Sequence, residues 1–138
     1  MGIEELNKIC KNTFIDHIGI RFKQFDGTHM LAEIKITDHH LQPDGVVHGG
    51  VYISMAETIA GAASTLLVRD EGKIALGVSV NSHHLASVTE GVITAEGQLI
   101  YKATFKHVWD IRISDDKGKL ISISRVTNSI KQNNFTKK

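Results

Sequence analysis

The 138-residue sequence has only one cysteine, Cys10, and only one proline, Pro43. A lone cysteine excludes an internal disulfide, as is usual for proteins of a reducing compartment. The first eleven residues contain no apolar run of the kind that a secretory signal requires. We therefore expect a cytoplasmic protein whose stability comes from its hydrophobic core.

An excess of charge of either sign is also missing. The formal net charge is +1, from 16 basic and 15 acidic residues, and the basic residues are scattered along the chain. A nucleic-acid reader would show a basic face interleaved with aromatics, so we expect no nucleic-acid partner. The length suits one domain, with a core over about residues 14–130 and a polar tail over 131–138.

The hydrophobic pattern predicts an α+β fold. Spacing typical of a short helix covers 4–14, and strict alternation predicts a strand over 29–37. A helix over 49–68 follows, and then alternating segments joined by short turns predict strands over 74–85, 92–103, 105–114 and 120–130. Short connections favour an antiparallel meander, so we expect a curved antiparallel sheet wrapped around the long central helix.

The predicted helix 49–68 has Glu57 as its only charged residue. A helix that is apolar on all sides should be buried on all sides. At about 30 Å it is also long enough to cross a membrane. However, a central carboxylate costs about 2.5–3.5 kcal/mol on insertion, and the strands would be left without a core. We therefore expect no membrane span.

The start of this helix carries a second signal. Gly49 and Gly50 follow His48, and the free backbone N–H groups of a helix start attract negative charge. Glu57 lies about 12 Å farther along the axis, too far to act with the helix start on one small group. The two features either serve different sites or meet across a symmetric dimer. A purely structural role for Glu57 remains the alternative.

The run from Gln42 through His48-Gly49-Gly50 to Glu57 resembles the signature of hot-dog-fold acyl-CoA thioesterases. The resemblance is strongest to the branch of 4-hydroxybenzoyl-CoA and 1,4-dihydroxy-2-naphthoyl-CoA thioesterases. The phenylacetate-pathway thioesterases share the layout, with aspartate at the position of Glu57. The segments Asn81-Ser82-His83-His84-Leu85 and Val88-Thr89-Glu90-Gly91 also resemble that family.

The resemblance implies hydrolysis of an acyl-CoA carrying an aromatic or medium acyl group, by Glu57 as nucleophile or general base. It implies that the Gly49 N–H polarises the carbonyl, and that Gln42 and His48 of the other subunit orient the thioester. Residues implied to line the substrate site are Gly50, Tyr52, Gly61 and His84. It further implies a homodimer with shared sites, assembled into a homotetramer, and no cofactor beyond the coenzyme A of the substrate.

Two positions depart from the family pattern. The family often places serine or threonine at the position of Gly61, and Thr58 and Ser64 are imperfect substitutes for that hydroxyl. A basic residue that commonly meets the coenzyme A phosphates is replaced by Ala86; Lys102, Lys106 and Arg125 are the candidates to compensate, although each is expected to be an ordinary solvated charge. The adjacent histidine pairs point to opposite faces of their strands, so we expect no metal site.

Two other functions compete with hydrolysis. One is hydration or dehydration of acyl thioesters on the same fold, which the spacing of Gln42, His48 and Glu57 disfavours. The other is a non-catalytic acyl-CoA-binding or oligomerisation module, which would not need Glu57.

Overall fold

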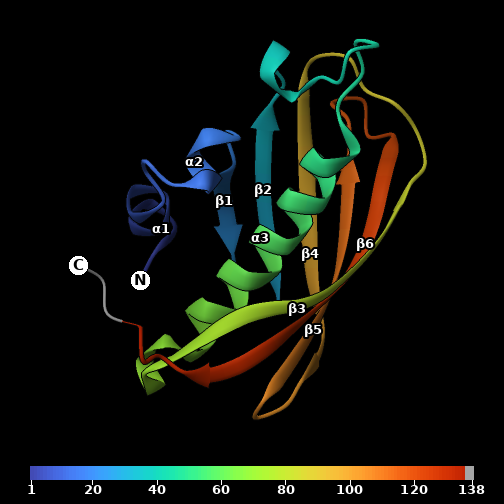
Figure 1. Ribbon diagram of the computed structural model, residues 1–138. Coiled ribbons are helices and arrows are strands. Elements are labelled where there is room, and N and C mark those ends of the chain that lie inside the picture. Colours follow the sequence, from blue (N-terminus) through green and yellow to red (C-terminus); the bar gives the residue numbers. More distant parts are fainter. Residues whose placement is uncertain (136–138) are drawn as a thin grey trace.

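The computed structural model describes residues 1–135, which form one sheet and one long helix with small helices beside them (Figure 1). The helices are α1 (Ile3–Ile9), α2 (Phe14–His17) and α3 (Gly49–Val68), with short 3-10 turns η1 (Asp38–His40) and η2 (Arg69–Glu71). The strands are β1 (Arg21–Phe25), β2 (His29–Lys35), β3 (Lys73–His84), β4 (Val92–Lys102), β5 (Lys106–Ser114) and β6 (Leu120–Gln132).

The six strands form one antiparallel sheet in the order β1-β2-β4-β5-β6-β3. Its concave face curves around α3 (Figure 1), so the expected α+β architecture is confirmed. The expectation of one continuous meander is wrong for β3. Because α3 crosses the sheet diagonally, its C-terminal end lies beside the end of β6. Strand β3 begins there, and Lys73 pairs with Gln132. That position makes β3 an edge strand.

The ends of the domain also differ from expectation. The pattern did not reveal β1, in which only Phe22 is buried and a register shift interrupts the alternation. The N-terminal helix is shorter than expected, yet Leu6 and Cys10 belong to the core. Strand β6 extends through Gln132, so the first two residues of the expected tail are in the sheet. Residues 136–138 of that tail lie outside the described range.

Helix α3 has the predicted bounds, but burial on every side is wrong. One face packs on the sheet through Met55, Ile59 and Ala63, all fully buried. The opposite side leaves Glu57 exposed and Ile53 40% exposed. The segment Gly49–Glu71 is apolar and long enough to cross a membrane, and its contact with the sheet accounts for that composition. The sheet wraps only part of the helix, so a carboxylate at position 57 reaches solvent.

A buried polar cluster fixes α3 to β5 and β6. Trp109 Nε1 and Asn128 Nδ2 donate to Ser64 Oγ at 2.7 and 3.4 Å. The Ser64 hydroxyl is then free to donate to His107 Nδ1, 2.7 Å away. Burial, with a smaller contribution from Lys102, lowers the pKa of His107 and favours the neutral ring that this bond requires. Ser64 is thus a structural anchor, and the expectation that it substitutes for a substrate-binding hydroxyl is wrong.

We expect Ser64→Ala to lower the free energy of unfolding by about 1–3 kcal/mol, because buried groups of Trp109 and His107 would lose their partner. Urea unfolding measures this change. Ser54→Ala is the matched control: Ser54 is half-buried on the same helix, and its replacement should change stability by less than about 0.5 kcal/mol. Equal stability of the two variants would contradict the anchoring role.

Candidate active site

The N-terminus of α3 begins with a histidine cap. His48 has an extended backbone, and its Nδ1 accepts the Gly50 N–H at 2.8 Å. Because Nδ1 accepts, the ring proton is on Nε2, which can donate outward. The Gly49 N–H has no acceptor among residues 1–135, so it is available to a ligand. This end of the helix can therefore stabilise negative charge.

His84 and Tyr52 pack beside this helix start. A Cβ added at Gly49 would lie 3.0 Å from His84 Nε2, so the ring lies against the backbone of Gly49. Ser122 Oγ holds His84 Nδ1 at 2.9 Å, and the Tyr52 ring lies 5.2 Å from the His84 ring. Desolvation, and then the neighbouring His83, lower the pKa of His84. The Tyr52 hydroxyl is buried without a hydrogen-bond partner in the described chain.

Gln42 organises the loop that leads to the helix. Its backbone N–H donates to the Val46 carbonyl at 2.8 Å, and its side-chain Oε1 accepts the Asp44 N–H at 2.6 Å. The side-chain oxygen is therefore occupied, whereas the N–H groups of the amide nitrogen Nε2 are free to donate to another partner.

Glu57 lies against β3 instead. A Cβ added at Gly77 would come within 2.9 Å of Glu57 Oε1 and 3.0 Å of its Cδ. The absence of a side chain at Gly77 is therefore what leaves room for the carboxylate. Gly77 adjoins a register shift between β3 and β6, and a bulge of this kind often lies next to a functional site. No sequence signal identified this contact, because it depends on how β3 docks on α3.

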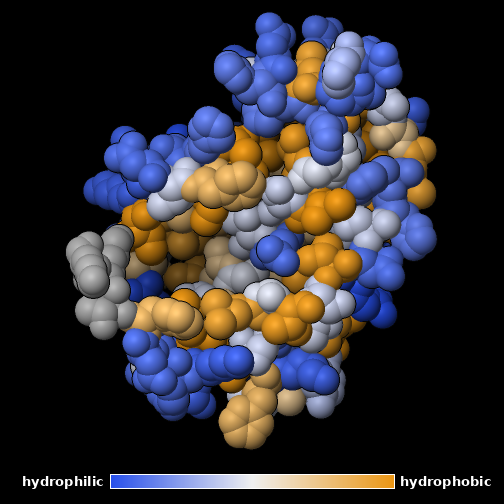
Figure 2. All heavy atoms as spheres, viewed as in Figure 1, coloured by the Kyte–Doolittle hydropathy of each residue, from blue (hydrophilic) through white to orange (hydrophobic). Residues whose placement is uncertain are grey.

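The Glu57 carboxylate adjoins a cavity of about 350 Å³ between α1, α3 and β3. Figure 2 shows the hollow between α1 and α3, with mainly hydrophobic atoms inside it. Its lining comprises Leu6, Ile9, Cys10, Ile15, Glu57, Thr58, Gly61, Ala62, Thr65, Leu66, Arg69, Ala75, Leu76 and Gly77. Gly61 and Thr58 thus lie with Glu57. The contribution of α1 was not expected, although its apolar stripe was visible in the sequence.

The predicted site residues therefore fall into two groups within one subunit. Gln42, His48, Gly49, Gly50, Tyr52 and His84 gather at the start of α3, whereas Glu57 and Gly61 lie at the cavity. Eight residues of helix, about 12 Å, separate Gly49 from Glu57. Strand β3 touches both groups, since Gly77 contacts Glu57 and His84 contacts Gly49.

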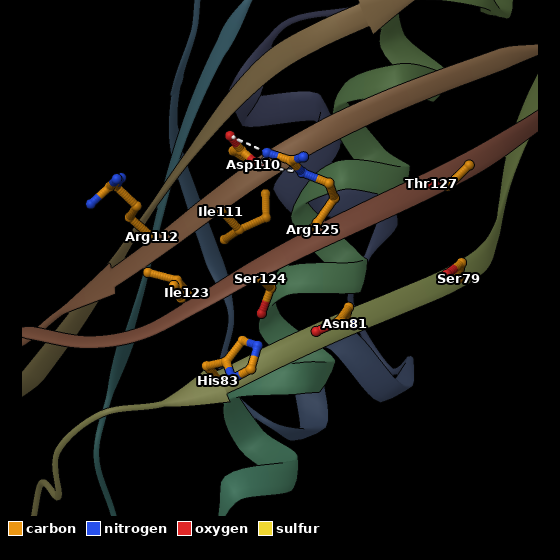
Figure 3. A pocket seen from close by; sticks show the side chains of 10 residues that line it. All are labelled: Ser79, Asn81, His83, Asp110, Ile111, Arg112, Ile123, Ser124, Arg125 and Thr127. Carbon is orange, nitrogen blue, oxygen red and sulfur yellow. Dashed lines mark hydrogen bonds and ion pairs between the residues drawn. The ribbon is translucent and has the colours of Figure 1, made fainter.

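A larger concavity, of about 520 Å³, lies on the face of the sheet away from α3 (Figure 3). Strands β3, β5 and β6 line it with Asn81, His83 and Arg112 among others. Arg125 bonds Asp110 there through two contacts of 2.8 and 3.1 Å. Its charge is thus already paired, and none of the predicted catalytic residues lines this face.

The central part of the chain, residues 44–122, matches the family model of the thioesterase superfamily. The chain belongs to the thioesterase superfamily. The matched region contains every predicted site residue of both groups except Gln42, which lies two residues before it. Thioester hydrolysis is therefore the class of reaction.

Individual members of the superfamily are similar over most of their length. A 1,4-dihydroxy-2-naphthoyl-CoA hydrolase of Escherichia coli is 30% identical over 128 residues, covering 93% of each chain. A thioesterase structure from Haemophilus influenzae is 33% identical, with a TM-score of 0.92 over 100% of this chain and 96% of that one. A Staphylococcus aureus thioesterase, solved with a glutamine replaced by alanine, is 31% identical with a TM-score of 0.82 over 85% and 97%. These likenesses confirm the hot-dog fold.

We expect Gly77→Ala to slow thioester hydrolysis by about 10- to 100-fold, because the new methyl group displaces the Glu57 carboxylate. The side chain that must move is flexible, so the fold should be retained. Steady-state kinetics and thermal unfolding measure the two effects. Gly2→Ala is the control, since a Cβ there meets no atom within 4 Å and Gly2 lies outside the cavity lining. Unchanged turnover in Gly77→Ala would contradict the importance of this contact.

Proposed function

We propose that this thioesterase hydrolyses acyl-CoA to a free acid and coenzyme A at sites shared between two subunits. One observation carries the proposal. Within a single subunit the Glu57 carboxylate lies at the apolar cavity, whereas the free Gly49 N–H lies about 12 Å away along α3. One subunit alone therefore does not bring this carboxylate and this N–H to one thioester.

The edge strand β3 supports the sharing. Among the described strands it lies at one end of the sheet, it is 12 residues long, and it exposes Val78 at 62%. An unpaired edge of this kind is a template for pairing with another chain. Antiparallel pairing of two β3 strands about a two-fold axis reverses one strand relative to the other. It would bring the His84 end of one copy, with Gly49, towards Gly77 and Glu57 of the second.

The roles of the residues follow from this juxtaposition. Glu57 would attack the thioester carbonyl, or take a proton from a water that attacks it. The Gly49 N–H would stabilise the oxyanion that forms. The free donors of Gln42 Nε2 and His48 Nε2 would orient the thioester and the departing thiolate. Water supplies the hydroxyl of the acid and the proton of the thiol, so hydrolysis needs no cofactor beyond the coenzyme A of the substrate.

The relatives support these assignments. The Escherichia coli protein is named as a hydrolase of a CoA thioester. The Staphylococcus aureus protein was solved with a glutamate replaced by alanine and, separately, with a glutamine replaced by alanine. Those two positions are fifteen residues apart, the same separation as between Gln42 and Glu57. The remaining expectations, a cytoplasmic location and a tetramer of two dimers, belong to the same proposal.

Glu57→Gln should reduce turnover of acyl-CoAs by at least about 100-fold, because the amide is neither a nucleophile nor a base. Thiol release from a panel of aromatic and aliphatic acyl-CoAs measures the loss. Glu5→Gln, an exposed glutamate of α1 outside the cavity lining, is the control and should match the wild type. A fully active Glu57→Gln enzyme would make the carboxylate structural and favour a different site.

Gly49→Pro should reduce turnover by about 100- to 1000-fold, because proline removes the proposed oxyanion donor. Proline suits the first position of a helix, and the extended backbone of His48, with φ −63° and ψ 133°, suits a residue before proline. Gly49→Ala is the matched control, since it makes the same contact with His84 but keeps the N–H. Equal turnover in the proline and alanine variants would exclude this N–H as the donor.

A further inference from the structure

We propose that the acyl group of the substrate is a flexible aliphatic chain, held between α1, α3 and β3, and that Gly61 sets the length of chain accepted. This inference rests on the proposed function, because the cavity concerned is the one beside Glu57.

The chemistry of the lining favours an aliphatic chain over an aromatic group. The cavity walls are aliphatic side chains such as Leu6, Ile9 and Leu66, and none of the lining residues is aromatic. Aromatic ligands gain from offset or edge-to-face packing on aromatic side chains, which this lining does not offer.

The direction of the chain follows from the helix. Glu57, Gly61 and Thr65 are spaced by four residues, so they lie along one face of α3. All three line the cavity, as does Leu66 beyond them. The axial distance from Glu57 to Leu66 is about 13.5 Å. An acyl group whose carbonyl lies at Glu57 can therefore extend along α3 beneath the apolar side chains of α1.

Gly61 lines this path and contributes no side chain to it. It lies one turn beyond Glu57, inside α3, where glycine costs about 1 kcal/mol relative to alanine in helix propensity. No contact with a neighbouring element requires glycine here, because an added Cβ would meet no atom within 4 Å. Gly49, Gly77 and Gly97, by contrast, face an atom at 3.1 Å or less. What the glycine at 61 preserves is empty space in the cavity.

The test is a chain-length profile. Thiol release is measured with straight-chain acyl-CoAs from butyryl to lauroyl, and with benzoyl-CoA, for the wild type, Gly61→Leu and Gly61→Ala. In Gly61→Leu we expect kcat/KM to fall by at least about tenfold for the longest chains and to change little for butyryl-CoA. Gly61→Ala adds only one methyl group and should cause a smaller loss for the longest chains, whereas Glu5→Gln, outside the cavity lining, should keep the wild-type profile. Both substitutions at Gly61 raise helix propensity, so both variants should fold.

A second variant tests the opposite direction. Leu66→Ala enlarges the far end of the cavity and should shift the preferred chain to greater length. Identical profiles for the wild type, Gly61→Leu and Leu66→Ala would overturn the assignment of the cavity. A wild-type preference for benzoyl-CoA over every aliphatic chain would overturn the substrate class. After either of these results, the proposed function would still stand if acyl-CoA hydrolysis depended on Glu57. The proposed function itself would fail if Glu57→Gln kept full activity.

Discussion

The rise of an α-helix, 1.5 Å per residue, is the constraint on which the proposed site depends. It places the free Gly49 N–H and the Glu57 carboxylate at separate points of α3, and no side-chain rotation closes a gap of about 12 Å. The rest of the domain is consistent with that separation. The sheet covers one face of α3, the edge strand β3 runs past both points, and the apolar cavity lies beside Glu57. A second subunit is the simplest source of the missing half.

Small or polar residues at a few packing contacts fix the positions of the Gly49 N–H and the Glu57 carboxylate. Ser64 joins α3 to Trp109 and His107 in the buried interior, which fixes the helix on the sheet. Gly97 of β4 allows close approach of Ile59, whose Cγ2 would be 3.1 Å from an added Cβ. Gly77 then gives the Glu57 carboxylate its place. The position of the carboxylate thus depends on backbone spacing as well as on its own residue.

Much of this could be predicted from the sequence, because it depends on local periodicity. Helix α3 has the predicted bounds, since Gly49–Val68 has no proline and follows a histidine cap. Glu57 stood out because it is the only charge in that helix. Features set by long-range pairing could not be predicted in this way. The place of β3 beside β6, the contact of Gly77 with Glu57 and the burial of Ser64 all depend on which segments dock together, and no local pattern encodes them.

The most direct test of the two-subunit site is complementation between Glu57→Gln and Gly49→Pro, each inactive alone. The two proteins are unfolded together, refolded as a mixture, and assayed for acyl-CoA hydrolysis, with each variant refolded alone as a control. When equal amounts of the two variants pair at random, half of the dimers contain one chain of each variant. Each of these mixed dimers has one intact site and one site that carries both substitutions. The account predicts recovery of about one quarter of wild-type activity. Activity no higher than that of the separate variants would contradict it, because each site would then be built within a single subunit.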